Sequence, residues 1–180
     1  LSIDQGTSGT KAIIVDGQGN VLAQAEAPVY PNHLAGGGVE QDPAELLASL
    51  LEAGRSAVAA SGAVIDAVAL ANQGETVLAW DPTTGVPLSP AIVWQDSRSQ
   101  EVCDELHGHR EWIAARTGLV LDPYFSAPKM TWLRRHVTRE GVVTTTDSWL
   151  VHQLTGEFVT DVTTTMTSAS VPATASSIPG

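Results

Sequence analysis

The segment 3–16, which reads IDQGTSGTKAIIVD, constrains the fold of this chain more than any other stretch. It begins as an apolar strand that ends at Asp4, passes through a turn of Gly, Ser and Thr residues, and returns as a second apolar strand. Gly6 and Gly9 carry no β-carbon, so the backbone of this turn is able to approach an anion closely. The layout favours a phosphate pocket, although an ordinary hairpin turn of small polar residues would have the same composition.

The side chains around this turn match the chemistry of a polyphosphate and its metal ion. A carboxylate repels phosphate, so the natural partner of Asp4 is a divalent cation, most simply Mg²⁺ bound through water. Hydroxyl and amide donors without bulk, together with one mobile positive charge, would contact the phosphates. The predicted phosphate-binding residues are Thr7, Ser8, Gly9 and Lys11, and the predicted metal-binding residue is Asp4.

Four later segments carry further motifs. They read GVEQDP at 38–43, NQGET at 72–76, AIVWQDSR at 91–98 and TGLVLDPYFS at 117–126. The opening strand–turn–strand resembles the first phosphate segment of the superfamily that contains actin, heat-shock ATPases and sugar kinases. The five segments together are similar to the amino-terminal domain of the FGGY carbohydrate kinases, the family of glycerol kinase. The resemblance extends from Ile3 to about Asp161.

The resemblance implies a fold and a domain division. The fold is α/β, an actin-like or ribonuclease-H-like domain whose mixed sheet starts with an antiparallel hairpin and is flanked by helices. We expect this domain to occupy residues 1–161 and to be incomplete at its carboxyl end. Residues 162–180 are almost entirely Thr, Ser, Ala and Pro, which cannot bury much apolar surface, and we interpret them as a tail at a point of truncation.

The resemblance also implies substrate-binding residues. In the family, an Arg–Glu pair, a tryptophan and a tyrosine hold the polyol, and these positions fall here on Gly74, Glu75, Trp94 and Tyr124. Gly74 therefore stands where the family has arginine. Because glycine offers no hydrogen-bond donors to sugar hydroxyls, we expect glycerol to be a poor substrate and a bulkier polyol or sugar to fill the vacated volume.

The resemblance implies ATP and Mg²⁺ as cofactors and transfer of the ATP γ-phosphate to a hydroxyl of a small polyol or sugar. The general base of the family opens a second domain and has no counterpart here, so no catalytic residue is assigned and the chain alone is expected to be inactive. Two alternatives remain. One is a non-catalytic half-kinase that binds sugar, and the other is an actin-like or chaperone-type ATPase that has no use for Glu75, Trp94 and Tyr124.

The composition of the chain disfavours several classes of binding partner. With 9 basic and 20 acidic residues the formal net charge is −11, which disfavours nucleic acid and anionic membranes. No apolar run approaches the ~20 residues of a membrane span. Cys103 is the single cysteine and excludes a disulfide within the chain, which fits a cytoplasmic protein. The family assignment allows a homo-oligomer of the full-length protein.

Hydrophobic spacing predicts several elements. Asp42 is expected to cap a helix that runs to about residue 60, and the apolar run 64–71 is expected to form a strand covered on both faces. Two strands at 76–80 and 87–94 would flank the turn 81–85. Short helices are expected with Asp96 or Ser97 as N-cap, around Trp112 up to Gly118, and from Asp147 to Leu154.

A further helix is expected to open at Pro128. Its apolar residues Met130 and Leu133 would point inward, and its basic residue Lys129 would point outward. Asp96 and Arg98 are expected to form an ion pair along the wall of the cleft, although helix capping accounts for Asp96 nearly as well.

Overall fold

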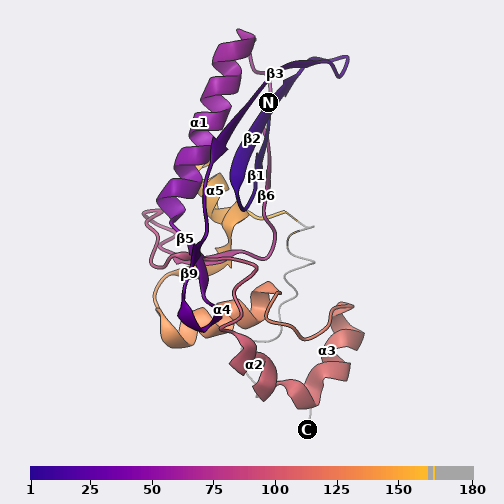
Figure 1. Cartoon of the computed structure of the whole chain (residues 1–180), viewed down its shortest axis with the longest axis vertical. Coiled ribbons are helices and arrows are strands. Elements are labelled where there is room, and N and C mark those ends of the chain that lie inside the picture. Colours follow the sequence, from indigo (N-terminus) through magenta and orange to yellow (C-terminus); the bar gives the residue numbers. More distant parts are fainter. Residues whose placement is uncertain (162–163, 165–180) are drawn as a thin grey trace.

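The computed structural model describes residues 1–161 and residue 164, and it places two sheets with helices around them (Figure 1). The first sheet has the strand order β3-β2-β1-β6 and the second has the order β4-β5-β8-β7-β9. The strands of the first sheet are β1 (Ser2–Gln5), β2 (Gly9–Val15), β3 (Val21–Pro28) and β6 (Ala69–Asn72). Those of the second are β4 (Asn32–His33), β5 (Val39–Gln41), β7 (Val77–Trp80), β8 (Ala91–Ile92) and β9 (Val142–Thr145).

The longest helix, α1 (Pro43–Ser61), lies along the first sheet, and the shorter helices lie toward the other end of the molecule or between the sheets (Figure 1). They are α2 (Gln100–Glu105), α3 (Arg110–Thr117), α4 (Ser126–His136) and α5 (Thr146–Thr155), with 3-10 turns η1 (Ala35–Gly37) and η2 (His107–His109). No helix among the described residues combines the length and the apolar character needed to cross a membrane.

The first sheet confirms the predicted mixed sheet that starts with a hairpin. β1 and β2 pair antiparallel, with Asp4 opposite Lys11, and β2 continues antiparallel to β3. β6 then pairs parallel to β1, with Gln5 opposite Asn72. Because parallel strands end at the same edge of a sheet, the turn after β1 and the segment after β6 leave the sheet side by side.

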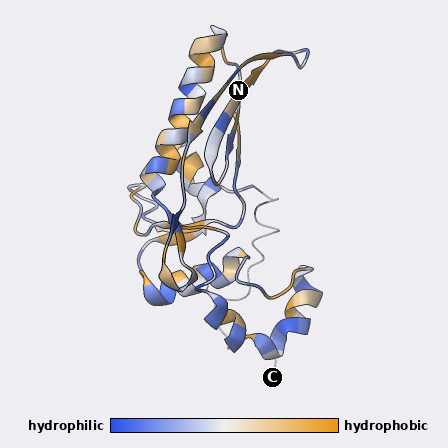
Figure 2. Ribbon diagram, in the orientation of Figure 1, coloured by the Kyte–Doolittle hydropathy of each residue, from blue (hydrophilic) through white to orange (hydrophobic). Residues whose placement is uncertain are grey.

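Helix α1 follows the sequence prediction closely. Asp42 occupies the N-cap position, where its side chain accepts a hydrogen bond from the Ala44 amide at 2.8 Å, and Pro43 opens the helix. Leu46 and Leu50 are fully buried against the first sheet. Figure 2 shows apolar and polar residues alternating along α1, as expected for a helix with one buried face.

The cap predicts a measurable stability effect. Asp42→Ala removes the acceptor for the Ala44 amide, so we expect the free energy of unfolding to fall by about 1 kcal/mol in a denaturant titration. Asp66→Ala is the matched control, because Asp66 is exposed and makes no hydrogen bond within the described residues. Equal losses in the two variants would contradict a capping role for Asp42.

The central strand of the second sheet, β7, is buried on both faces. Leu78 and Trp80 join the core between α1 and the first sheet, to which α5 adds Trp149 and Leu150. On the opposite face, Val77 and Ala79 pack with Leu133 of α4. Since side chains alternate along a strand, one short strand thus links two hydrophobic clusters.

Four expectations about local structure need correction. The run 64–71 is not a strand covered on both faces, because β6 begins only at Ala69 and Val64 is 89% exposed. Neither Asp96 nor Ser97 caps the next helix, because α2 starts at Gln100 and its N-cap residue is Ser99. The second sheet includes β9, which the sequence analysis missed.

The fourth correction concerns Lys129, which is fully buried instead of pointing outward. It lies one helical turn before the buried Leu133 and therefore on the same face of α4. Apart from residue 164, the predicted tail 162–180 lies outside the described residues, and the division at 161/162 stays an expectation.

Candidate active site

A hollow of about 300 Å³ lies where the turn after β1, the segment after β6 and the segment after β8 meet. It brings together residues that are far apart in the sequence, and six of the seven were predicted to bind metal, phosphate or substrate or to shape the turn after β1. The lining residues are Asp4, Gly6, Thr7, Gln73, Gly74, Trp94 and Tyr124. The hollow therefore joins the predicted metal residue and one of the four predicted phosphate residues, Thr7, to three of the four predicted substrate residues.

A closed set of hydrogen bonds fixes the floor of this hollow. The Thr7 hydroxyl donates to Gln73 Oε1 at 2.9 Å and accepts from Trp94 Nε1 at 2.9 Å. Gln73 Nε2 donates to Gln41 Oε1 at 2.7 Å, and Gln41 Nε2 donates back to the Thr7 carbonyl at 2.8 Å. Because Gln41 lies on β5 and Thr7 follows β1, these bonds tie the two sheets together and hold the Trp94 indole in one orientation.

Two aromatic rings form one wall. The rings of Trp94 and Tyr124 meet edge to face, with centroids 5.7 Å apart and an interplanar angle of 64°. Tyr124 is 45% exposed, so much of its ring remains free to contact a ligand. Such faces pack well against the C–H groups of a polyol or sugar.

Gly74 leaves open space in the wall. It is exposed, and a β-carbon added to it would meet no atom within 4 Å. A larger side chain would therefore fit sterically, and in its absence the volume belongs to the hollow.

Glu75 lies behind the lining residues and is only 4% exposed. Its Oε2 accepts hydrogen bonds from the Ser126 amide and the Ser126 hydroxyl, both at 2.6 Å, and so holds the first residue of α4. Oε1 makes no hydrogen bond within the described part of the chain. Among the described residues Glu75 is the one non-glycine residue with a positive φ, 62°, a strained conformation of a kind that often marks functional sites.

The predicted phosphate residues are only partly gathered. The turn is closed by the Gly6 amide, which donates to the Gly9 carbonyl at 2.9 Å, and Ser8 is exposed beside it. Lys11 does not line the hollow, because its Nζ pairs with Glu26 at 2.7 Å. Hydrogen bonding to Glu26 raises the pKa of Lys11. The hydroxyl proton of Thr7 is engaged by Gln73, which leaves the backbone amides of the turn as donors for an anion.

Asp4 is exposed at the end of β1 and faces the hollow. The described residues contain no group of three His, Cys, Asp or Glu side chains that would enclose a metal ion. Mg²⁺ usually keeps several waters and binds through one or two carboxylates plus substrate phosphates. A single exposed carboxylate beside the predicted phosphate turn fits that mode of binding.

The wall beyond Trp94 contains the predicted ion pair. Arg98 contacts Asp96 at 2.7 Å and Glu40 at 2.7 Å, and its guanidinium stacks on Trp132 at 4.3 Å. Asp96 Oδ2 also accepts a hydrogen bond from the Val39 amide at 2.8 Å. The pair is thus confirmed as a structural link between β5, the segment after β8 and α4.

Sequence reasoning missed several residues of the site. Gln73 lies within the NQGET motif but was passed over, and Gln41 lies inside the segment 38–43, next to the helix cap Asp42. Ser126 and Lys129 were missed because their partners lie far away in the sequence or on the backbone. Only the spacing of Lys129 to Leu133 gave a signal that its side chain points inward.

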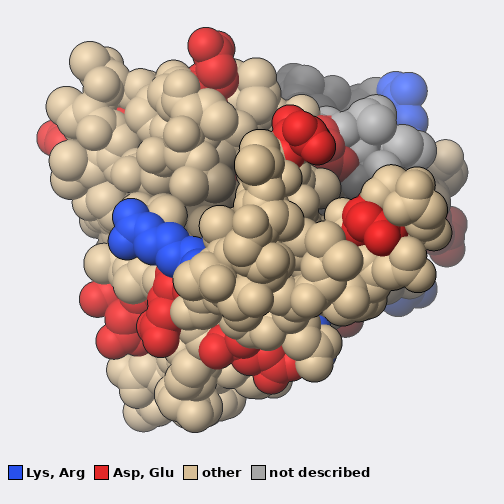
Figure 3. Space-filling model, turned by 90° about the horizontal axis from the view of Figure 1, so that it is seen from above, with Lys and Arg blue, Asp and Glu red and all other residues tan. Residues whose placement is uncertain are grey.

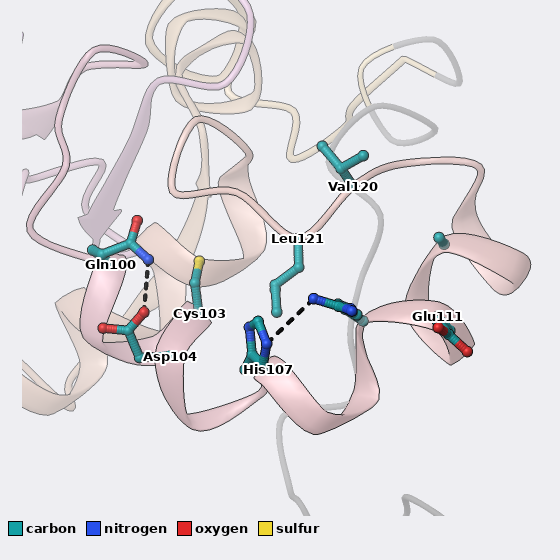
Figure 4. A pocket seen from close by; sticks show the side chains of 9 residues that line it. Gln100, Cys103, Asp104, His107, Glu111, Val120 and Leu121 are labelled. Carbon is teal, nitrogen blue, oxygen red and sulfur yellow. Dashed lines mark hydrogen bonds between the residues drawn. The ribbon is translucent and has the colours of Figure 1, made fainter.

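A second hollow, of about 430 Å³, lies between α2, η2, α3 and the segment that carries Val120 and Leu121 (Figure 4). Four of its polar side chains form two pairs, Gln100 with Asp104 at 2.8 Å and Arg110 with His107 at 3.3 Å. Burial raises the pKa of the Cys103 thiol to about 11, so this thiol is unreactive at neutral pH. None of the predicted site residues lines this hollow, although it is the larger of the two.

Comparison with known proteins decides the family. Residues 1–172 match the model of the FGGY family of carbohydrate kinases, N-terminal domain. The chain belongs to the FGGY carbohydrate kinases. It is 42% identical over 169 residues to a glycerol kinase of Aromatoleum aromaticum, covering 87% of this chain and 34% of that protein. It is 43% identical over 178 residues to a glycerol kinase of Leptothrix cholodnii, covering 91% of this chain and 36% of that protein.

Solved structures agree. The glycerol kinase of Plasmodium falciparum, determined with ADP, superimposes with a TM-score of 0.87 at 31% identity over 93% of this chain and 36% of that one. A xylulose kinase from Brucella ovis gives 0.85 at 28% identity over 92% of this chain and 36% of that one. The predicted fold class is confirmed. The FGGY chain described here spans about a third of the length of the curated relatives it matches.

Proposed function

We propose that this chain is the amino-terminal part of an ATP-dependent carbohydrate or polyol kinase, which transfers the γ-phosphate of ATP to a substrate hydroxyl. The observation that carries the proposal is the shared hollow of Asp4, Thr7, Gly74, Trp94 and Tyr124. Phosphoryl transfer needs positioning and charge stabilisation more than covalent chemistry from the protein. A carboxylate, a turn of small residues and an aromatic wall in one hollow meet those needs for a sugar acceptor.

In this proposal the sugar lies against Trp94 and Tyr124, with its C–H groups on the two rings. Glu75 Oε1 would accept a hydrogen bond from a substrate hydroxyl, while Oε2 keeps its hydrogen bonds from Ser126. The open space at Gly74 favours a polyol or sugar larger than glycerol.

The phosphates of ATP would contact the turn that contains Thr7, Ser8 and Gly9, and Asp4 would hold Mg²⁺ through water. Lys11 would contact a phosphate only after its ion pair with Glu26 breaks. When bound, Mg²⁺ would neutralise charge on the transferring phosphoryl group.

Transfer itself would need a second domain. The general base and the adenine site of the family have no motif-matched counterpart in this sequence, and closure of two domains would exclude water from the reactants. We therefore expect the chain alone to bind ligand without turning over ATP. A cytoplasmic location, where ATP is available, and a homo-oligomer of the full-length protein belong to the same proposal. Carboxylates are more frequent than basic side chains over the face shown in Figure 3, and this charge disfavours nucleic acid as a partner.

A thermal-shift panel of glycerol, xylitol, xylulose and gluconate, each with and without Mg-ATP, tests the proposal. We expect the melting temperature to rise with at least one polyol or sugar and to rise further with Mg-ATP. Stabilisation by sugar but not by nucleotide would identify a sugar-binding half-kinase. Stabilisation by nucleotide alone would favour an actin-like ATPase, and ATP turnover by the chain would contradict the need for a second domain.

Trp94→Ala should weaken binding of the stabilising sugar about tenfold, because it removes an aromatic face worth about 1.4 kcal/mol in such contacts. Isothermal titration calorimetry measures the change. Trp112→Ala is the matched control, since Trp112 is half-buried on α3 and packs against Arg116 at 5.2 Å, away from the lining residues. An unchanged affinity for the sugar in the Trp94 variant would contradict the proposal that the sugar packs against the Trp94 ring.

A further inference from the structure

Lys129 is one of the two lysines of the chain, and it is fully buried. Its Nζ donates to the carbonyls of three consecutive residues: Pro123 at 3.0 Å, Phe125 at 2.9 Å, and Tyr124 between them. An ammonium group has three N–H donors and no acceptor, so these three carbonyls use its full capacity. A buried charge is tolerated only when it is satisfied in this way.

The segment 123–126 is held from its other side by an opposite charge. Glu75 accepts hydrogen bonds from the Ser126 amide and hydroxyl. The buried Glu75 carboxylate therefore binds the amide at the end of the segment, while the buried Lys129 ammonium binds its carbonyls. Tyr124 and Phe125 lie between these two anchors, and the Tyr124 ring is the one that meets Trp94 at the hollow. The ammonium itself lies 6.0 Å from the centre of the Tyr124 ring.

We propose that Lys129 is a positioning residue for the sugar pocket: by gathering three consecutive carbonyls, its ammonium group sets the direction in which the Tyr124 ring points into the hollow. The importance of this for sugar binding rests on the proposed function, whereas the coupling of Lys129 to Tyr124 does not. Within the described part of the chain, Tyr124 is the one lining residue to which Lys129 donates a hydrogen bond, so its effect on a ligand would pass through that ring.

The charge of Lys129 offers a way to test the coupling. Burial lowers the pKa of Lys129 to about 8, against the opposing attraction of Glu75, Asp96 and Asp122, which face it from the segments after β6 and β8 and the segment before α4. Cys103 of α2 also faces Lys129. The Cys103 thiol, with a pKa of about 11, remains neutral near pH 8. A neutral amine has two donors and a lone pair, so above pH 8 one of the three carbonyls loses its partner and the Tyr124 ring should become less fixed.

The sign of this effect separates it from general unfolding. The pKa of Lys129 is lower in the folded chain than its ordinary value of 10.5, so between about pH 8 and 10.5 the unfolded chain holds the proton and the folded chain does not. The contribution of Lys129 to stability therefore rises with pH in this window. A Tyr124 ring that loosens in the same window cannot be the result of this group unfolding the protein.

The experiment is NMR on the 180-residue chain labelled with ¹³C in lysine and tyrosine, titrated from about pH 6.5 to about pH 9. Phenols ordinarily ionise near pH 10, above this range. The chain has two tyrosines, and Tyr30 is an exposed internal control. We expect the Lys129 signal to titrate with a midpoint near pH 8, the Tyr124 ring signals to shift with the same midpoint, and the Tyr30 signals to stay constant.

In the Lys129→Met variant the Tyr124 signals should no longer shift near pH 8, because methionine keeps a similar aliphatic side chain but has no ammonium group. Lys11→Met is the matched control, since Lys11 is exposed, and it should leave the Tyr124 titration unchanged. Tyr124 signals that stay constant while the Lys129 signal titrates would overturn the proposal. So would Tyr124 signals that shift with the same midpoint in the Lys129→Met variant as in the wild-type chain. If that variant does not fold, the titration of the wild-type chain decides. No sugar is needed, so failure of the proposed function would leave this result intact.

Discussion

Gly74→Arg is expected to raise the affinity of the chain for glycerol about tenfold to hundredfold. A β-carbon at Gly74 would meet no atom within 4 Å, and the backbone there is not in the left-handed region, so the larger residue fits without strain. The new guanidinium would bring five donors to the hollow, at the position where the family resemblance places an arginine. Hydrogen bonds to a charged group contribute about 1.5–3 kcal/mol net, which gives the expected range.

The gain should depend on donors and on substrate size. Gly74→Leu is the matched control, because it fills similar space without donors and should bind glycerol no more tightly than the wild-type chain. Xylitol should lose affinity relative to glycerol in the arginine variant, since the guanidinium occupies volume that a longer polyol needs. Titration calorimetry with both polyols measures the ratio. Equal gains in the leucine and arginine variants, or weaker glycerol binding by the arginine variant, would remove Gly74 as the determinant of substrate size.

Local signals in the sequence were sufficient for the elements that begin and end with recognisable chemistry. The hairpin 3–16 could be predicted because a strand, a Gly-rich turn and a second strand follow one another without a gap. The Asp42–Pro43 start of α1 and the left-handed Gly62, Gly118 and Gly156 at helix ends are equally local. In each case the residue that fixes the geometry lies within a few positions of the backbone it controls.

Long-range polar contacts could not be predicted in this way. The hydrogen bonds of Thr7 to Gln73 and Trp94 join residues 66 and 87 positions apart, and a lone glutamine carries no periodicity that would reveal its partner. The position of Lys129 was mispredicted for a related reason. Its charge favoured the surface, whereas the carbonyls that satisfy it belong to the backbone and leave no mark on the sequence.

Glu75 shows how far the family resemblance reached. It was expected to face the substrate, and it lies next to the hollow with one oxygen committed to Ser126 at the start of α4. The substrate contact of Glu75 stays a prediction, and its hydrogen bonds to Ser126 indicate a second task, which is to fix the segment that carries Tyr124. Any change of Glu75 would disturb both, so Gly74 and Trp94 are cleaner probes of binding.

The largest loss of stability is expected for Gly141→Ala, at about 3 kcal/mol. Gly141 has a φ of +65°, which an L-residue adopts at a cost of roughly 1 kcal/mol. A β-carbon there would also lie 2.3 Å from the Trp80 carbonyl oxygen and 2.6 Å from Leu88 Cδ1. Trp80 pairs with Val142 in the second sheet, so the clash would push β7 away from β9 and disturb both hydrophobic clusters that β7 connects.

Gly156→Ala separates the backbone cost from the clash. Gly156 ends α5 with a φ of +78°, and a β-carbon there would meet nothing within 4 Å, so only the cost of about 1 kcal/mol should remain. For a chain of this size, the two losses correspond to falls in melting temperature of about 10 °C and about 3 °C. Thermal denaturation followed by circular dichroism measures both. If the two variants lost the same stability, the close approach of Gly141 to the Trp80 backbone would not constrain the second sheet, and β9 would have to tolerate a wider separation from β7 than its pairing indicates.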